Sequence, residues 1–244
     1  MAEPLLEAKG VTKRFAGNTA VNKVNLTIMP GEIVGLIGPN GAGKTTFFNL
    51  ITGFYRATEG TVLFDNKDIT LCTTYENCKA GMARTFQIVQ PFGQLTALEN
   101  VMVGAFNRVD NYAQAQLIAR VMIEFVGLED KIDAVVADLN IGDQRKLEMA
   151  RALATKPKLL LLDEVMAGLT PTEIEAVVEL VQKIRESGVT ILMIEHIMAA
   201  LMKLSDRVVV LDHGNLIAEG TPTEITQNER VIESYLGSAY KKNA

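Results

Sequence analysis

Residues 38–46 have the composition and spacing of a loop that binds phosphate groups. They read Gly-Pro-Asn-Gly-Ala-Gly-Lys-Thr-Thr, the pattern G-x-x-x-x-G-K-[ST]. Glycine lets the backbone curl until successive N–H groups point at one anion. Lys44 would bring a positive charge to the β- and γ-phosphates, and Thr45 would bring a hydroxyl group for Mg²⁺. The pattern predicts a nucleotide site formed by Gly38, Pro39, Asn40, Gly41, Ala42, Gly43, Lys44, Thr45 and Thr46.

The residues on either side of this loop support that interpretation. Glu32–Ile37 is an apolar run of strand length, and a helix is expected to begin near Lys44 and to end at Gly53. The positive end of this helix would face the phosphates. The alternative, a glycine-rich turn without a ligand, is disfavoured because strand, loop and helix follow one another as a phosphate site requires.

Two acidic residues, Asp163 and Glu164, follow the apolar run Leu159–Leu162. In an open α/β sheet the carboxyl ends of the strands share one edge, so these acids are expected beside the phosphate-binding loop. Asp163 can hold Mg²⁺ through water, and Glu164 can orient or deprotonate the attacking water. Without such a loop, surface acids would be the better interpretation. The second acid favours hydrolysis over transfer to a small substrate, and the lack of a suitably placed Asn-Lys-x-Asp guanine pattern favours ATP.

A second helix start also has the features of an anion site. Asn140 can cap a helix, Gly142 follows it, and an amphipathic helical pattern continues to Ala154. The loop at residues 38–46 already provides for the phosphates of the nucleotide that its own chain binds. This second helix start is therefore expected to serve a nucleotide that is held by another subunit.

Composition narrows the class of protein. The 244 residues are 48% hydrophobic, enough for one sizeable core or one core with a subdomain. The formal charge of −5 argues against broad nucleic-acid binding. Cys72 and Cys78 fit neither a zinc knuckle nor a redox pair and are read as ordinary thiols. Neither a signal peptide nor an apolar run of membrane-spanning length is evident, so work at a membrane would require a partner.

The order of predicted elements indicates an α/β protein. Strands and helices alternate in the last third of the chain, which implies a mostly parallel sheet covered on both faces. The middle, from about residue 70 to 138, resembles an inserted helical subdomain. Strands are predicted at Leu5–Lys9, Ala20–Ile28, Glu32–Ile37, Thr61–Phe64, Lys158–Leu162, Val189–Ile194, Arg207–Leu211 and Leu216–Glu219, and helices at Leu98–Phe106, Gln114–Val126, Asp143–Ala154, Pro171–Ser187 and Ile197–Leu204.

From about Leu5 to Leu236, the chain resembles the ATP-binding subunits of ABC transporters. The loop at residues 38–46 matches the Walker A motif, Leu159–Glu164 the Walker B motif and Leu139–Leu153 the family signature. The remaining matches are Thr85-Phe86-Gln87 to the Q-loop, Ile194-Glu195-His196 to the switch histidine, Ala167–Pro171 to the D-loop, and Phe15 to an aromatic residue that stacks on adenine.

The resemblance implies a P-loop NTPase fold with a RecA-like, mostly parallel core. An N-terminal antiparallel β subdomain, the inserted helical subdomain and a C-terminal extension at about 220–244 would complete a single nucleotide-binding domain over residues 1–244. Two such subunits, identical or paralogous, would pair head to tail with two ATP molecules between them. Each ATP would lie between one Walker A loop and the other subunit's Asn140 and Gly142.

The resemblance also implies roles for single residues. Gln87 would sense Mg²⁺ and the γ-phosphate and connect to the transport partner, and His196 would hydrogen-bond the γ-phosphate in the transition state. Other interpretations remain open: Gln87 as an ordinary polar residue after a strand, His196 as a satisfied histidine at a helix start, and Phe15 as core packing. His213 lies in an expected turn and is given no role.

Four positions depart from the family pattern, three in the signature and one after Glu164. The common signature begins Leu-Ser-Gly-Gly-Gln, whereas this chain has Leu-Asn-Ile-Gly-Asp. Asn140 lacks the usual hydroxyl group, and Asp143 brings a negative charge near a phosphate that Arg145 or another cation must offset unless Asp143 points away. Val165 replaces the usual proline after Glu164, which predicts a looser backbone there and slower turnover.

The best local match within the family is to the ATPases of branched-chain amino acid uptake, the LivG type. It rests on Ala83–Gln87, Leu95–Gly104, the Gly142–Glu148 segment, Gly220–Ile225 and Arg230–Gly237. The implied partners are two membrane permeases and, indirectly, a periplasmic binding protein, with the chain peripheral at the cytoplasmic face of the inner membrane. Urea or amide import, lipopolysaccharide export, a soluble non-transport ATPase and a non-hydrolytic regulator are the alternatives.

The segment Ile88–Phe106 is where a partner helix is expected to dock. Large apolar residues lie here beside the proposed ATP sensor and could form a groove, or they could pack inside the helical subdomain. Phe92 and Gln94 are predicted to be partly exposed. The other apolar residues of this segment are Leu95, Leu98 and Phe106.

Overall fold

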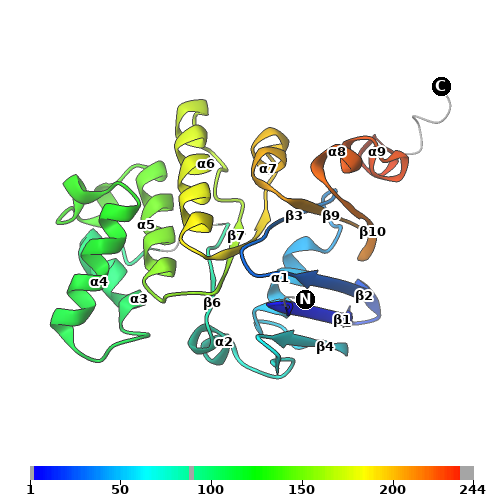
Figure 1. Cartoon of the computed structure of the whole chain (residues 1–244), viewed down its shortest axis with the longest axis horizontal. Helices are drawn as coiled ribbons and strands as arrows, with labels where there is room; N and C mark the ends of the chain where they lie inside the picture. The colour runs from blue at the N-terminus through cyan, green and yellow to red at the C-terminus, as the bar shows by residue number, and fades with distance from the viewer. Residues whose placement is uncertain (1–2, 88–90, 237–244) are drawn as a thin grey trace. The chain divides into compact units, whose positions relative to one another are not determined.

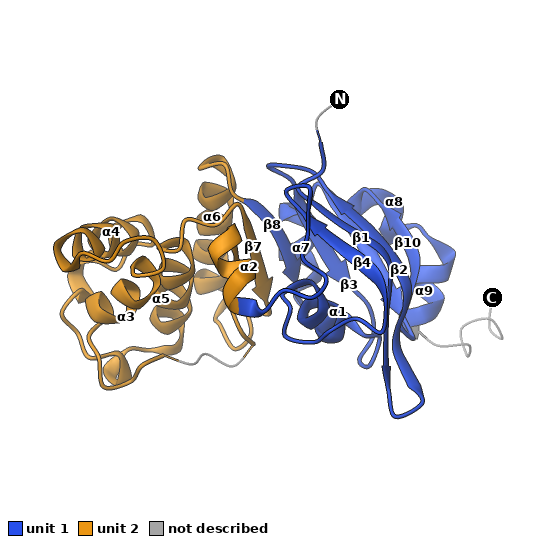
Figure 2. Ribbon diagram, turned by 90° about the horizontal axis from the view of Figure 1, so that it is seen from below, with its two compact units in different colours: residues 1–74, 190–244 blue, residues 75–189 orange. Residues whose placement is uncertain are grey.

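The structure is a computed structural model that describes residues 3–87 and 91–236 and divides into two compact units (Figure 2). Unit 1 comprises Met1–Thr74 and Thr190–Ala244, and unit 2 comprises Tyr75–Val189. The helices predicted for the inserted segment, about 70–138, lie in unit 2. That unit continues beyond the predicted end of the insertion and takes in the signature segment and the Walker B strand.

An antiparallel sheet of order β2-β1-β4-β5 forms the first part of unit 1 (Figure 1). β1 was predicted to stop at Lys9, but the strand continues to Phe15. It does so because Gly10, at φ 60°, sits in a register shift where its N–H donates to Asn25 Oδ1 at 2.8 Å. The strands are β1 (Leu6–Phe15), β2 (Asn18–Ile28), β4 (Glu59–Phe64) and β5 (Lys67–Asp68).

Unit 1 also contains the strand that leads into the Walker A loop. This strand, β3 (Ile33–Ile37), is wholly buried and pairs in parallel with β8 (Thr190–Ile194) and β9 (Arg207–Asp212). β9 turns back into β10 (Asn215–Gly220) as the predicted antiparallel hairpin. The two turn residues, His213 and Gly214, have φ angles of 43° and 78°, as a tight turn of this hand requires.

Four helices complete unit 1, namely α1 (Lys44–Ile51), α7 (Met198–Leu204), α8 (Pro222–Thr226) and α9 (Glu229–Leu236). α7 packs on β3 at Gly35. A Cβ at Gly35 would lie 2.7 Å from Ser205 Oγ and 2.8 Å from Leu201 Cδ2. Glycine is needed at this strand position because the helix approaches the backbone itself.

Unit 2 is mainly helical, and it contains one pair of parallel strands, in which Met82 lies opposite Leu159. Its helix ends follow the sequence closely: Thr170 caps α6 with a reciprocal bond to Glu173, and Pro171 occupies the first turn. α5 packs on α3 and α4. The elements are α2 (Thr74–Ala80), β6 (Met82–Arg84), α3 (Ala97–Ala105), α4 (Tyr112–Phe125), α5 (Ile141–Leu153), β7 (Leu159–Asp163) and α6 (Pro171–Glu186), with short 3₁₀ turns at Glu129–Lys131 and Val136–Asp138.

The architecture is the predicted one: α/β, with an antiparallel sheet, parallel strands around β3 and a separate group of helices. Among residues 3–87 and 91–236, no helix combines the length and the apolar character that crossing a membrane requires.

The close contact at Gly35 leads to a stability prediction. Gly35→Ala should lower the free energy of unfolding by about 1–3 kcal/mol, because the new methyl group forces α7 away from β3. Thermal unfolding of the purified chain measures this as a fall in Tm. Gly93→Ala is the control, since a Cβ there meets nothing within 4 Å; equal effects of the two substitutions would contradict the prediction.

Candidate nucleotide site

The Walker A loop joins β3 to α1 and packs directly on two neighbouring strands. Gly38 and Gly43 have φ angles of 151° and 101°, which L side chains rarely adopt. A Cβ at Gly38 would lie 2.1 Å from the carbonyl oxygen of Leu211, and one at Gly43 would lie 2.4 Å from that of Ala20. Backbone angle and lack of space therefore both require glycine, and β9 and β2 define the shape of the loop.

Lys44, the first residue of α1, directs its ammonium group back into the loop. Its Nζ donates to the carbonyl oxygens of Gly38 at 2.6 Å and Pro39 at 3.1 Å, and the residue is only 8% exposed. Gly43 provides no side-chain cap to α1, whereas Thr45 in the first turn is exposed. The loop thus combines a largely buried positive charge with the positive end of a helix, an arrangement that suits a phosphate chain.

Phe15 lies in an exposed aromatic group that the sequence did not reveal. It is 40% exposed, so simple core packing does not describe it. Its ring meets the ring of Tyr55 edge to face, with centroids 5.3 Å apart. The Lys13 ammonium lies 5.0 Å from the Phe15 centroid and donates to the Arg56 carbonyl at 2.9 Å. The group offers partly exposed aromatic rings next to a cation.

The Walker B acids differ in their surroundings within unit 2. Asp163 is 2% exposed, and its carboxylate accepts a hydrogen bond from Arg84 Nη2 at 2.6 Å. Its backbone N–H donates to Thr85 Oγ1 at 3.2 Å. The guanidinium keeps this buried carboxylate compensated. Nothing in the sequence singled out Arg84, because its role depends on β6 pairing with β7.

Glu164 and Gln87, predicted as base and sensor, are in contact. Gln87 Nε2 donates to Glu164 Oε2 at 2.7 Å. The Glu164 backbone is left-handed, with φ at 51°, an unfavourable conformation that is typical of functional positions. Val165, where a looser backbone was predicted, has a fully buried side chain, and the Ala167 N–H donates to the Glu164 carbonyl at 3.2 Å. Burial of the Val165 side chain and this hydrogen bond hold the turn after Glu164, where the family usually has a proline.

The signature segment forms the predicted capped helix start. Asn140 Oδ1 accepts the Asp143 N–H at 2.8 Å. The cation that offsets Asp143 is Lys131, whose Nζ lies 2.6 Å from the carboxylate. The hydrogen bond to Asp143 raises the pKa of the Lys131 ammonium. Arg145, the residue first expected in this role, instead faces the Q-loop.

The remaining predicted residues are distributed over both units. His196 follows β8 in unit 1 and is exposed, and His213 lies in the β9–β10 turn with its side chain 92% exposed. Unit 1 therefore carries the Walker A residues, Phe15 and His196. Unit 2 carries Gln87, Asp163, Glu164 and the Asn140–Gly142 helix start.

Comparison with known proteins agrees with these motifs. A family model described as ABC transporter matches residues 21–167. The chain is 41% identical to LivG, the high-affinity branched-chain amino acid transport ATP-binding protein of Escherichia coli K12, across 98% of this chain and 100% of LivG. It is 40% identical to BraF of Pseudomonas aeruginosa, across 98% of this chain and 100% of BraF.

The chain belongs to the ABC transporter family.

Within this ABC family, the chain groups with the branched-chain amino acid type. A second model, described as branched-chain amino acid ATP-binding cassette transporter, matches residues 215–241. Identity to the lipopolysaccharide export ATP-binding protein LptB of Escherichia coli K12 is 36%, over 97% of this chain and 98% of LptB. The predicted enzyme class, an ABC-type ATPase, is thereby confirmed.

Solved structures confirm the fold of this ABC cassette. The ADP conformation of MJ1267, an ATP-binding cassette of an ABC transporter, has a TM-score of 0.88 at 31% identity and covers 97% of this chain and 100% of that one. A dimeric post-hydrolysis state of the cassette MJ0796, bound to ADP and Pi, has a TM-score of 0.80 at 28% identity and covers 89% of this chain and 98% of that one.

Beyond the Q-loop of this ABC ATPase, the expected docking segment is partly open. Phe92 is 48% exposed and Gln94 is exposed, as predicted, and Phe106 is 41% exposed, whereas Leu98 is buried. The buried Asn100 accepts the Phe92 N–H at 2.9 Å and donates to the Phe92 carbonyl at 3.0 Å. The first part of the segment, residues 88–90, lies outside the described residues.

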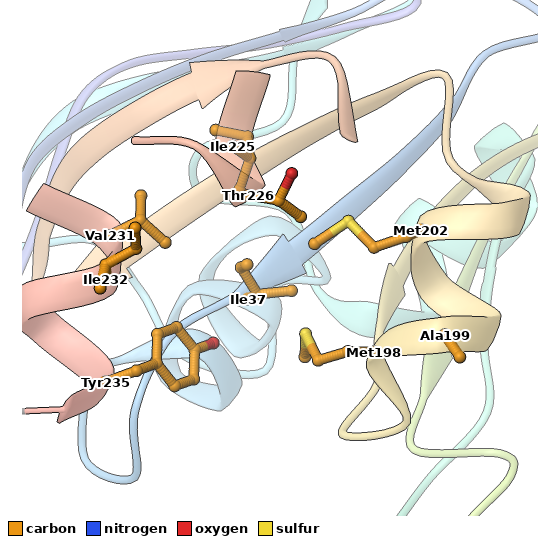
Figure 3. A pocket seen from close by; sticks show the side chains of 9 residues that line it. All are labelled: Ile37, Met198, Ala199, Met202, Ile225, Thr226, Val231, Ile232 and Tyr235. Atoms are coloured by element: carbon orange, nitrogen blue, oxygen red, sulfur yellow. The ribbon is translucent and has the colours of Figure 1, made fainter. Parts of the chain in front are cut away.

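Unit 1 of the ABC cassette also contains an apolar pocket of about 500 Å³ between α7 and the C-terminal helices (Figure 3). Burial raises the pKa of the Tyr235 phenol, and a hydrogen bond with the Gly38 backbone opposes this shift. α9 therefore reaches the first glycine of the Walker A loop. The described lining is uncharged and consists of Ile37, Met198, Ala199, Met202, Ile225, Thr226, Val231, Ile232 and Tyr235.

The cap at the start of α5 gives a prediction for the signature of this ABC ATPase. Asn140→Ala should lower the free energy of unfolding by about 1 kcal/mol, because the Asp143 N–H loses its acceptor. Asn140→Ser, the residue of the common signature, should retain most of that stability. Urea unfolding of both variants tests this. An unchanged free energy of unfolding in Asn140→Ala would show that the side-chain cap contributes nothing, and equal losses for Ala and Ser would show that serine does not replace it.

Proposed function

We propose that this chain is the ATP-hydrolysing subunit of an importer of branched-chain amino acids. The observation that carries the proposal is the near full-length identity of 41% to a transport ATPase named for that cargo. The match of the C-terminal residues 215–241 to a model with the same cargo in its description supports it independently of the shared ATPase motifs. Lipopolysaccharide export is the second candidate, because LptB is 36% identical over a similar length.

ATP would bind through the Walker A loop. Its backbone N–H groups and Lys44 would hold the β- and γ-phosphates, and Phe15 would stack on adenine beside Tyr55. Thr45, Gln87 and Asp163 supply a hydroxyl, an amide oxygen and a carboxylate, and such hard oxygen donors suit Mg²⁺. When bound, the ion would screen the charge of the phosphates and lower the barrier to attack on the γ-phosphate.

Hydrolysis would then depend on the residues at the end of β7 and β8. Glu164 would accept a proton from the attacking water, and Gln87, already hydrogen-bonded to Glu164 at 2.7 Å, would hold that carboxylate in position. His196 would donate a hydrogen bond to the γ-phosphate as charge develops on it. The left-handed backbone at Glu164 supports this role, because such strain is retained where a side chain must point in one direction.

The second ATP-binding subunit, a copy of this chain or a paralogue, would complete each site. The start of α5, with Asn140 and Gly142, would approach the nucleotide of the opposite subunit. The Lys131–Asp143 pair at 2.6 Å supports this role, because it cancels the charge that Asp143 would otherwise present to a phosphate. The dimer described for MJ0796 with ADP and Pi supports such an assembly.

Membrane partners would receive the energy of this cycle. Two permease subunits would dock through the segment around Phe92, Gln94 and Phe106, whose side chains are exposed and which follows Gln87 in the sequence. A periplasmic binding protein would deliver the cargo to the permeases. The chain would then sit peripherally at the cytoplasmic face of the inner membrane, and nucleic acid has no part in this function.

Replacement of the proposed base tests the enzyme. Glu164→Gln should reduce phosphate release from ATP by about 10²–10⁴-fold while ATP binding persists, because the amide cannot accept the proton. The same variant should accumulate as an ATP-bound dimer, measured by light scattering with ATP and Mg²⁺. Glu186→Gln, an exposed change on α6, is the control. Unchanged turnover in Glu164→Gln, or a monomer under these conditions, would count against the proposal.

Uptake tests the cargo. In cells that lack their own branched-chain amino acid uptake, the chain expressed with its permeases and binding protein should restore accumulation of radiolabelled leucine. Glu164→Gln in the same complex should fail to do so, because transport requires hydrolysis. Labelled urea serves as the competing cargo, and restored urea uptake without leucine uptake would reject the branched-chain assignment.

A further inference from the structure

The backbone of the Q-loop is held by two buried charged residues of the signature helix. Arg145 Nη1 donates to the Phe86 carbonyl at 3.0 Å, and Arg145 Nη2 donates to the Gln87 carbonyl at 2.7 Å. The Phe86 N–H donates to Glu148 Oε1 at 3.0 Å. Three backbone groups of two neighbouring residues in an irregular segment are thus satisfied by side chains of α5.

Both residues are suited to hold a loop rather than merely to fill a core. Each is 4% exposed, and Arg145 Nη1 lies 3.9 Å from Glu148 Oε2, so the charges balance. The planar guanidinium fork spans two neighbouring carbonyl oxygens, which a lysine ammonium does not reproduce. Desolvation raises the pKa of Glu148, while the Phe86 N–H and nearby arginines oppose that shift.

The held segment leads directly to the reacting groups. Gln87 is fixed to α5 through its carbonyl, and its side-chain amide contacts Glu164 at 2.7 Å. Arg84, which precedes this segment in the sequence, binds the Asp163 carboxylate. Movement of α5 would therefore move the backbone of Gln87 relative to the end of β7.

We propose that Arg145 and Glu148 are positioning residues that tie Gln87 to the signature helix, so that the Gln87–Glu164 contact follows the position of α5. The inference rests on the proposed roles of Gln87 and Glu164 in hydrolysis. It adds a physical link between the helix start that would meet the opposite subunit's nucleotide and the sensor of the chain's own nucleotide. Neither Arg145 nor Glu148 is required to touch ATP.

A buried ion pair that served only the core could be exchanged for apolar residues of similar volume without functional loss. The double variant Arg145→Met/Glu148→Leu removes all three bonds to the Q-loop together, along with both members of the buried ion pair. Glu148→Gln is the conservative variant, because its amide oxygen can still accept the Phe86 N–H. Arg145→Lys keeps the charge but loses the fork.

Hydrogen exchange of the full chain, followed by mass spectrometry, measures the link without reference to activity. In the double variant, the Phe86 amide, whose acceptor on Glu148 is lost, should exchange at least tenfold faster. The Thr85 amide, which donates to the Leu161 carbonyl at 2.9 Å, and the amides of β7 should stay as protected as in the wild type. Glu148→Gln, which keeps an acceptor for the Phe86 N–H, should keep most of the protection. Unchanged exchange of the Phe86 amide in the double variant would overturn the proposal, whether or not the chain hydrolyses ATP.

Kinetics then tests the consequence for chemistry. With wild-type turnover established in the assembled transporter, the double variant and Arg145→Lys should lower kcat at least tenfold and change the KM for ATP less than twofold. Glu148→Gln should retain kcat. If the double variant exchanges faster but keeps the wild-type kcat, the proposed link between α5 and hydrolysis is refuted. Phosphate release by the wild-type chain would in that case still support the ATPase function.

Discussion

Direct packing of backbone on backbone is the constraint on which the nucleotide site depends. The Walker A loop lies so close to β2 and β9 that a Cβ at Gly43 or Gly38 would collide with a strand carbonyl oxygen. Space is also tight at Gly35, where the Leu201 and Ser205 side chains lie against the backbone of β3. Because the Walker A loop packs directly on strand carbonyl groups, it keeps one shape, with the Lys44 ammonium group directed back into the loop. The packing of the loop on these strands therefore fixes the shape of the proposed phosphate site.

Unit 2 holds the Walker B acids and the proposed sensor, Gln87, in defined positions. Asp163 is buried against Arg84, Glu164 is held in a left-handed backbone, and Gln87 bridges from the Q-loop to Glu164. Arg145 and Glu148 close the arrangement from the side of α5. Each buried charge has an opposite charge or a hydrogen-bond partner nearby, as a low-dielectric interior requires.

The departures from the common ABC signature are accommodated locally. Asn140 caps α5 as a serine would, and Lys131 neutralises Asp143. Val165 is anchored by burial where other members of the family rely on proline. Asn140 acts on the same turn of the helix that it caps, whereas Lys131 belongs to a separate 3₁₀ turn that precedes α5. Each of these departures therefore has a contact in the structure that compensates for it.

Sequence alone determined the features that depend on local chemistry. The Walker A loop, the caps at Asn140 and Thr170, the β9–β10 hairpin and most of the strands and helices follow from residue types at short spacing, and the structure has them where they were predicted. The roles of Phe15, Gln87 and His196 came from family resemblance, whereas those of the Walker B acids were argued from their place at the end of a strand. All of these roles remain proposals.

Tertiary structure decided the partners of the charged residues. Arg84 meets Asp163 only because β6 pairs with β7, and Arg145 turns to the Q-loop rather than to Asp143 only because α5 packs beside that segment. A sequence pattern shows which side chains lie on one face of a helix or strand. Packing between elements far apart in sequence decides which partner each charged side chain contacts. Local periodicity therefore predicted the scaffold of this ATPase, and only the fold revealed how its charges are paired.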